Sequence, residues 1–170
     1  MATILKAPAR LTAAQRKTTT TLYLAGPFED GDGDATPPRS WRDEVIDAFA
    51  DDDVTLVDPR NPRWPGLEAR GPGQRGAFEW QCTVAYDADV VIVWVPEGRH
   101  APTALMILGA LAAKRSKAGQ GSSVVVGGDG WGGLLKVFAQ NQRLFPIDGG
   151  LDEVIRIARL QLNNARAARR

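Results

Sequence analysis

The chain has 170 residues, with 21 Lys and Arg against 20 Asp and Glu, so its formal net charge is +1. This length fits one domain, at roughly 100 to 200 residues per domain. A net charge this close to zero creates no global field that would recruit a nucleic acid polymer or an anionic membrane. The single cysteine, Cys82, excludes an internal disulfide, which fits a reducing cytosol and weakens the case for a secreted scaffold.

The first twenty residues differ in composition from the rest of the chain. Residues 1–20 are basic and contain no acidic residue. They lack the apolar centre and the cleavage pattern of a signal peptide, so we expect a flexible N-terminal tail, with an organelle transit peptide as the alternative. We expect one domain over residues 21–165 and a basic C-terminal tail over residues 166–170. The longest apolar run, residues 90–96, is far shorter than the roughly 20 residues that span a bilayer, so we expect a soluble protein. Together with the single cysteine, this predicts a cytoplasmic protein.

The first half of the chain alternates strand and helix patterns. Residues 21–25 are a short β-prone run that ends at a Gly-Pro pair. Residues 40–49 place apolar side chains at helical spacing behind an approximate capping box. Residues 54–57 predict a second strand, which ends because the following Asp-Pro phrase supplies a proline with no amide for the ladder. Residues 61–76 hold four glycines and three prolines, a composition typical of a lid or binding loop.

The second half continues the alternation. Residues 77–87 predict a helix, and the continuously apolar run at residues 90–95 is typical of a central parallel strand. The remaining expected elements are a helix at 101–117, a strand at 122–126, a helix at 130–140, a strand at 144–147 and a helix at 151–162. This order predicts an α/β fold, doubly wound, with a five-stranded, mainly parallel sheet in the order 2-1-3-4-5 and helices on both faces. The helix face over residues 101–113 is almost wholly apolar, so we expect it to pack against a second copy.

The loops that follow the strands are the expected site, because ligands of such sheets bind outside the carboxyl ends of the strands. These loops are residues 23–28, 58–60, 97–100 and 127–131. Gly26 would let backbone approach a ligand, and residues 127–130 would present amides to a phosphate or carboxylate. The alternative is that these glycines serve tight turns.

Three side chains near the predicted central strand are of types that carry acid–base or metal chemistry. Glu79 lies between two aromatic residues, so we expect it to be buried with a raised pKa. Asp89 is expected to cap the entry to the strand. His100 is the only histidine, and without a Cys/His cluster we expect no metal site.

Aromatic and basic side chains in the predicted loops suit a nucleobase or a phosphate. Trp64 and Trp131 are the expected base platforms, since a stacked base gains about 1 to 3 kcal/mol, although surface tryptophans also mark subunit contacts. The candidates for gripping a phosphate through a planar guanidinium are Arg60, Arg63 and Arg99. The sequence does not choose among them.

Seven short sequence segments follow one another along the chain. They are Tyr23-Leu24-Ala25-Gly26-Pro27, Trp41-Arg42, Asp58-Pro59-Arg60, Phe78-Glu79-Trp80, Ala88-Asp89-Val90, Pro102-Thr103-Ala104-Leu105-Met106-Ile107-Leu108-Gly109 and Val125-Val126-Gly127. In order and spacing they resemble the nucleoside 2-deoxyribosyltransferase-like family, from Tyr23 to about Gly150. The resemblance implies a flavodoxin-like or Rossmann-like fold, transfer or hydrolysis of the bond between a base and deoxyribose or ribose, a nucleoside or nucleotide as small-molecule partner, a homo-oligomer, and no cofactor.

The resemblance also implies which residues form the site. In such enzymes a carboxylate attacks the anomeric carbon while an acid helps the base to leave, as in retaining glycosidases. The family's nucleophilic glutamate lies in a Glu-Leu-Gly phrase, where this chain has Ile107-Leu108-Gly109. The remaining candidates for the catalytic carboxylates are Glu79 and Glu97. The residues expected to bind the substrate are Tyr23, Gly26, Pro27, Phe28, Asp58, Arg60, Trp64, Asp89, His100, Ile107 and Gly127.

Two functions therefore stay open. The first is an enzyme acting on an N-glycosidic bond, with Glu79 or Glu97 in place of the absent glutamate. The second is a nucleotide-binding or sensory protein that kept the pocket and lost catalysis, in which case Glu97 is a solvated loop acid. If Ile107 occupies the nucleophile position, its side chain should face a pocket formed by Tyr23, Gly26 and Glu79. The alternative is that Ile107 is plain core.

Overall fold

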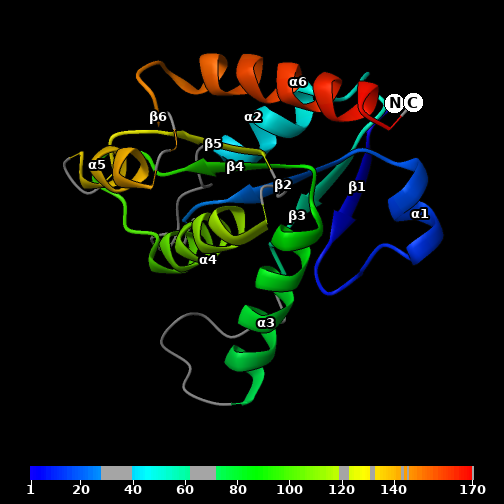
Figure 1. The fold of residues 1–170 in the computed structure, drawn as a ribbon, viewed down its shortest axis with the longest axis horizontal. Coiled ribbons are helices and arrows are strands. Elements are labelled where there is room, and N and C mark those ends of the chain that lie inside the picture. Colours follow the sequence, from blue (N-terminus) through cyan, green and yellow to red (C-terminus); the bar gives the residue numbers. More distant parts are fainter. Residues whose placement is uncertain are drawn as a thin grey trace, which may run out of the picture.

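The sheet is parallel and has six strands in the order β1-β3-β2-β4-β5-β6, as Figure 1 shows. This computed structural model describes residues 1–27, 40–61, 72–118, 123–130, 133–142, 144 and 146–169. The strands are β1 (Thr3–Lys6), β2 (Thr21–Ala25), β3 (Thr55–Asp58), β4 (Val90–Trp94), β5 (Ser123–Gly127) and β6 (Pro146–Ile147). All five neighbouring pairs are parallel. The α/β class and the parallel sheet expected from the sequence are confirmed.

Helices cover both faces of the sheet. They are α1 (Ala13–Thr18), α2 (Trp41–Ala48), α3 (Pro72–Asp87), α4 (Pro102–Ala118), α5 (Leu134–Asn141) and α6 (Leu151–Ala167). One apolar cluster joins the sheet to α3, α4 and α5, and a second cluster joins it to α2 and α6. Figure 1 shows the same two layers, with α2 and α6 above the sheet and α3 and α4 below it.

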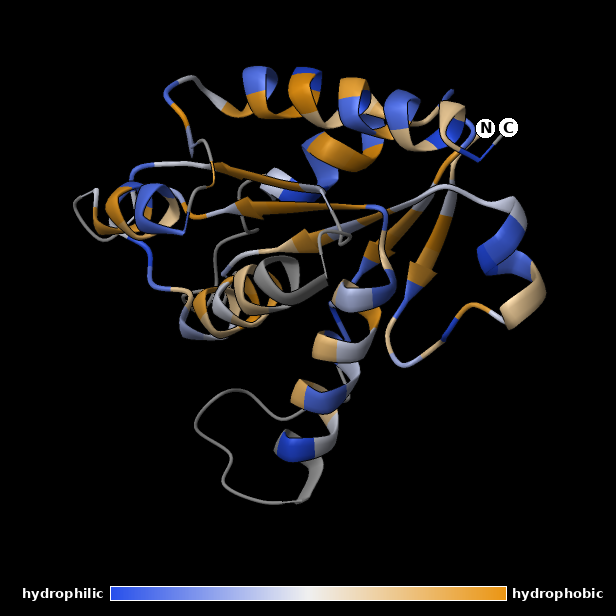
Figure 2. Ribbon diagram, viewed as in Figure 1, coloured by the Kyte–Doolittle hydropathy of each residue, from blue (hydrophilic) through white to orange (hydrophobic). Residues whose placement is uncertain are grey.

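The position of β4 inside the sheet explains why the sequence is apolar without a break at residues 90–95. Side chains alternate across a strand, so Val91 and Val93 join the α3/α4/α5 layer whereas Val90 and Ile92 join the α2/α6 layer. All four are fully buried. A parallel strand covered on both faces needs an apolar residue at every position, and Figure 2 shows the inner strands as the most hydrophobic part of the ribbon.

The sixth strand, β1, lies in the stretch that we expected to be a flexible tail. It pairs with β3 in parallel register from Thr3 opposite Thr55 to Lys6 opposite Asp58. The other five strands follow the expected order 2-1-3-4-5. The sequence pattern did not predict β1, because an edge strand that is mostly exposed needs no apolar run, and its four residues are largely exposed. Its stability comes from the ladder with β3, which is a long-range contact.

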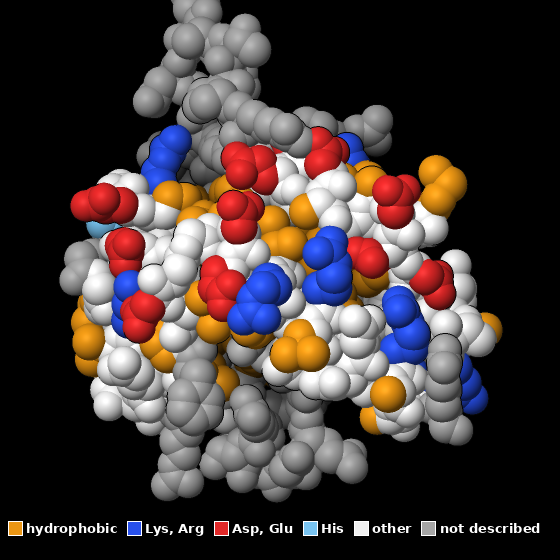
Figure 3. All heavy atoms as spheres, turned by 90° about the horizontal axis from the view of Figure 1, so that it is seen from above, with side chains coloured by type: hydrophobic (Ala, Val, Ile, Leu, Met, Phe, Trp, Pro, Cys, Tyr) orange, Lys and Arg blue, Asp and Glu red, His pale blue; other side chains and the backbone are white. Residues whose placement is uncertain are grey.

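The last helix extends beyond its predicted end at residue 162. Its amphipathic face packs on the sheet through Val154, Ala158 and Leu162. Near its end, Arg166 donates to the backbone oxygen of Asp53 and Arg169 donates to that of Thr19. Figure 3 shows that acidic and basic side chains are mixed on this face of the molecule. No helix in the described ranges is long and apolar enough to cross a bilayer.

Candidate functional site

The switch point of the sheet lies between β2 and β4. The chain leaves β2 for β3 on one side, and later passes from β4 to β5 on the other. In open parallel sheets the crevice at such a point, outside the carboxyl ends of the strands, is where ligands bind. The segments that reach this edge are residues 26–27 after β2, 59–61 after β3, 95–100 after β4 and 128–130 after β5.

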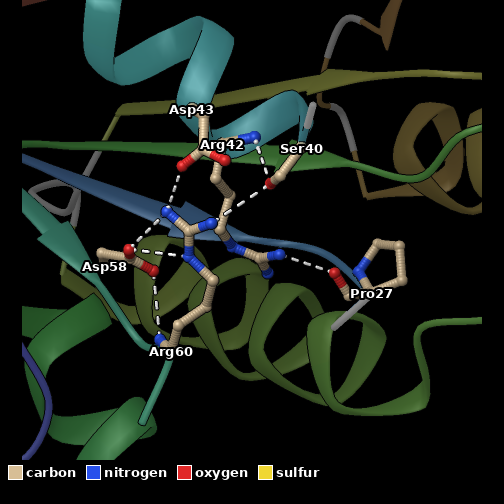
Figure 4. A network of polar contacts seen from close by, with 6 residues as sticks. All are labelled: Pro27, Ser40, Arg42, Asp43, Asp58 and Arg60. Carbon is tan, nitrogen blue, oxygen red and sulfur yellow. Dashed lines mark hydrogen bonds and ion pairs between the residues drawn. The ribbon is translucent and has the colours of Figure 1, made fainter. Parts of the chain in front are cut away.

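A buried arginine holds the turn after β2. The Arg42 side chain is fully buried, and its guanidinium donates to the carbonyl oxygen of Pro27 at 2.6 Å (Figure 4). It also donates to the carbonyl oxygen of Gly26 at 2.9 Å. It also lies 4.4 Å from the ring centroid of Trp41. A buried charge is tolerated only where polar partners replace water, so these carbonyls and this guanidinium depend on each other. The sequence contained a sign that Arg42 is buried, because Arg42 lies on the apolar stripe of α2, three residues before Val45.

Packing explains the glycine at the end of β2. A Cβ at Gly26 would lie 2.4 Å from the backbone oxygen of Trp94 and 2.6 Å from the Trp41 ring. No real Cβ makes contacts this short without displacing its neighbours. Gly26 therefore lets the turn pass between Trp41 and β4, and the close approach that it permits is to the protein's own groups.

The carboxyl end of β3 carries an ion-pair network. Asp58 is fully buried and accepts from Nε of Arg60 at 2.8 Å and from its backbone amide at 3.0 Å. The same guanidinium contacts Asp43 at 2.7 Å and Ser40 at 3.4 Å (Figure 4). Burial lowers the pKa of Arg60, but the hydrogen bonds and charges of Asp43 and Asp58 outweigh it and raise that pKa above its ordinary value. The carboxylates of Asp43 and Asp58 thus occupy donors of the Arg60 guanidinium, so Arg60 does not offer an open bidentate site to a phosphate.

The glycine-rich turn after β5 is bonded to β4. The amide of Gly130 donates to the carbonyl oxygen of Val95 at 2.8 Å, and the amide of Val95 donates to Gly127 at 3.2 Å. Gly128 has a φ of 91°, and a Cβ there would lie 2.2 Å from the Val95 oxygen. The Gly130 amide is therefore not available to a phosphate, and these contacts favour the tight-turn interpretation of this segment.

The loop after β4 places Glu97 at the switch point. Glu97, Arg99 and His100 are all exposed there. Glu97 has no ion-pair or hydrogen-bond partner among the described residues, which sets it apart from the other carboxylates at this edge. Asp43 and Asp58 share Arg60, whereas Asp129 and Asp148 share Lys136 at 2.7 and 3.1 Å.

Tyr23 and Asp89 lie away from the crevice. The Tyr23 side chain is fully buried in the layer under α3, where its hydroxyl donates to Gln81 at 3.3 Å, and burial raises its pKa far above the ordinary value. Asp89 precedes β4, so it lies at the amino edge of the sheet. Its carboxylate accepts from the amide and hydroxyl of Thr21 at 2.8 and 2.9 Å and pairs with Arg169. Asp89 thus lies at the entry to β4, as expected, and both residues lie away from the carboxyl edge, where the resemblance implied that they bind the substrate.

The expected burial of Glu79 is wrong. Its side chain is 58 % exposed and accepts from Arg75 at 2.7 Å, one turn earlier on α3. The helix turns its neighbour Trp80 inward instead, and the indole nitrogen donates to Ala9 at 3.1 Å. Ile107 is 2 % exposed and belongs to the apolar cluster of α4 and the sheet.

Several expected site residues lie outside the described part of the chain. They are Phe28, Trp64 and Trp131, together with Arg63. Pro27 and Gly127 are described and buried at the carboxyl edge. Within the described ranges, no group of three or more His, Cys, Asp or Glu side chains could hold a metal ion.

The sequence profile of one family matches residues 19–119, which is 101 of the 170 residues. Its description is "nucleoside 2-deoxyribosyltransferase like". The chain belongs to the nucleoside 2-deoxyribosyltransferase-like family. The match runs from just before β2 to the end of α4, so it includes the turns after β2, β3 and β4. No curated protein matches the chain.

Proposed function

We propose that the protein acts on the N-glycosidic bond of a nucleoside or nucleotide bound at the carboxyl edge, and that Glu97 is the attacking carboxylate. Family membership supports the class of ligand and of reaction. The observation that carries the proposal is the position of Glu97 after the central strand, at the switch point, where the other described carboxylates are held by Arg60 or Lys136. A carboxylate already paired with a cation is a poorer nucleophile than one without a partner.

The reaction follows the double-displacement pattern of retaining glycosidases. The carboxylate of Glu97 attacks the anomeric carbon, the bond from this carbon to the base nitrogen breaks, and its electron pair leaves with the base. Water, or a second base, then attacks the same carbon and releases Glu97. Water makes the protein a hydrolase, and a second base makes it a transferase. Glu79 stays the candidate for the second carboxylate of the pair, although its pairing with Arg75 and its exposure weaken that role.

The experiment is an assay for free base with a panel of nucleosides, deoxynucleosides and their monophosphates. We expect release by the unmodified chain and loss of at least about a thousandfold in kcat for Glu97→Gln, as for a missing nucleophile. Asp51→Asn is the matched control, because Asp51 is an exposed carboxylate in the turn between α2 and β3 at the opposite edge of the sheet. Equal turnover by the Glu97 variant and the control would refute the role of Glu97.

A binding protein without catalysis is the second candidate. Ile107, at the position where the resemblance places the nucleophile, is buried and apolar, and no hydrocarbon side chain can attack a sugar. Thermal-shift measurements on the same panel separate the two functions. Stabilisation by a compound whose base is never released favours the binding protein, whereas release that disappears in Glu97→Gln favours the enzyme.

A further inference from the structure

A small cavity lies between the N-terminal segment and α3, on the side of the sheet away from the carboxyl edge. The segment is fastened to α3 at two points. The indole nitrogen of Trp80 donates to the backbone oxygen of Ala9 at 3.1 Å, and Arg16 contacts Asp87 at 2.5 Å. Figure 1 shows the chain between β1 and α1 beside the last turns of α3. Between these two attachments the segment passes over the cavity, with the side chain of Leu11 in its wall.

The cavity is lined by apolar, hydroxyl-bearing and charged residues, and two of the charged residues are arginines. The lining residues are Leu11, Val57, Val84 and Ala88 (apolar), Thr21 and Thr83 (hydroxyl), and Arg10, Arg16 and Asp87 (charged). Both hydroxyl groups are already engaged within the protein. Thr21 is bonded to Asp89, and Thr83 donates to the backbone oxygen of Glu79. A ligand would therefore contact hydrocarbon in the walls and charge at the arginines.

The charged groups favour an anion. Arg10 is exposed and has no ion-pair or hydrogen-bond partner among the described residues. Arg16 contacts Asp87 through one of its terminal nitrogens. A guanidinium carries five N–H donors, so both arginines keep donors for a ligand, and with Asp87 the three groups sum to one positive charge. A planar carboxylate matches the guanidinium fork.

We propose that this cavity binds a small organic carboxylate, whose charged group pairs with Arg10 and Arg16 and whose short apolar tail packs against Leu11 and Val84. An inorganic anion would leave the apolar part of the walls unfilled, and a neutral compound would leave Arg10 without a charged partner. None of the residues that line the cavity is aromatic, so a base would find no ring on which to stack. This site therefore stands apart from the function proposed above.

Butyrate tests the proposal, with acetate and 1-butanol as probes that lack the tail and the charge. Each compound is titrated at millimolar concentration into the full chain, and amide shifts are followed in nitrogen–proton correlation spectra. We expect butyrate to shift the amides of Thr83, Val84 and Ala88, and acetate and 1-butanol to shift them much less. Absence of these shifts, or equal shifts with acetate or 1-butanol, would overturn the proposal.

Two variants locate the site. Arg10→Ala should weaken the binding of butyrate about threefold to tenfold, since it removes one exposed charge pair. Arg156→Ala on α6 is the matched loss of an exposed arginine and should leave the affinity for butyrate unchanged. Thr83→Leu fills the cavity from a half-buried helical position and should abolish the shifts. Binding that survives both Arg10→Ala and Thr83→Leu would place butyrate elsewhere and refute the site.

Discussion

At the residue scale, two buried side chains, Arg42 and Ile107, have unexpected environments. Arg42 is a charge in the core that satisfies two backbone carbonyls. Ile107 is an apolar residue at a position where the resemblance implies a carboxylate, and it packs in the cluster under the sheet. Both environments lead to predictions about stability that need no knowledge of the ligand.

Arg42→Ala should lower the free energy of unfolding by about 3 kcal/mol. The substitution leaves the carbonyl oxygens of Gly26 and Pro27 without their donor in a buried turn, and each unsatisfied group costs about 1 to 3 kcal/mol. Urea denaturation measures the loss. Arg156→Ala serves as control, because that arginine is exposed and its partner in the described part of the chain is Glu153 on the same helix, so we expect a change within about 0.5 kcal/mol. Similar losses in the two variants would contradict a special role for Arg42.

Ile107→Glu distinguishes a residue facing the crevice from plain core. If Ile107 is core, the variant buries a carboxylate among hydrocarbon and should destabilise the fold by more than about 3 kcal/mol. If Ile107 faces a polar crevice, the glutamate reaches water and the cost is small. Leu160→Glu, at a position 49 % exposed on α6, is the control for adding a glutamate to a helix. The same two variants, unfolded in urea and assayed for base release, also test whether the glutamate restores catalysis.

At the element scale, the N-terminal segment pairs with the sheet and packs against α3. β1 extends the sheet beyond β3, and the chain then crosses to α3, where Trp80 and Asp87 hold it. These contacts join elements that are about 70 residues apart in sequence, as the spacing of 71 between Trp80 and Ala9 shows. The segment is therefore held both by its ladder with β3 and by its contacts with α3.

Trp80→Phe should loosen this segment more than it loosens the central sheet. The phenylalanine keeps most of the buried ring but loses the donor to the Ala9 oxygen, a bond worth about 1 kcal/mol. Hydrogen exchange of the β1 amides should accelerate severalfold, whereas exchange in β4 should follow only the global stability. Equal acceleration in β1 and β4 would show that the segment does not open separately.

At the scale of the whole molecule, the buried phenol of Tyr23 links stability to pH. Burial raises its pKa above the ordinary value of 10.0, an effect that the charge of Arg42 partly offsets. The folded state therefore keeps the phenol neutral after the unfolded chain has begun to ionise. The contribution of Tyr23 to stability is complete below about pH 10 and is lost as the pH rises above that value.

Above pH 10 we expect this phenol to cost about 1.4 kcal/mol of unfolding free energy per pH unit. Tyr23→Phe should remove this part of the slope between pH 10 and higher values in urea denaturation. Tyr86→Phe is the matched control. Burial and Cys82 raise the pKa of Tyr86 too, but its side chain is only half-buried and is therefore more solvated than that of Tyr23. An unchanged slope in Tyr23→Phe would contradict the assigned burial of the phenol.

Association of two copies through α4 stays a prediction. Met106 on α4 is 57 % exposed, and Leu134 and Val137 on the neighbouring α5 are 57 % and 52 % exposed. A second copy would remove this apolar surface from water. Light scattering at micromolar concentration should report a dimer or larger species, and Met106→Glu should shift it toward the monomer. A monomer in both samples would refute the contact.

The sequence by itself determined the α/β class, the parallel sheet and the order of five strands, because apolar runs and helical stripes are local patterns that any covered sheet requires. The seven short segments described in the sequence analysis also carried the resemblance to the family. Only the tertiary structure decided that residues 3–6 form a strand, that Arg42 is buried, and that Asp43 shares the Arg60 guanidinium with Asp58. These features depend on contacts between residues far apart in sequence. Exposure is equally a tertiary property, which is why Glu79, placed between two aromatic residues, turned outward while Trp80 turned inward.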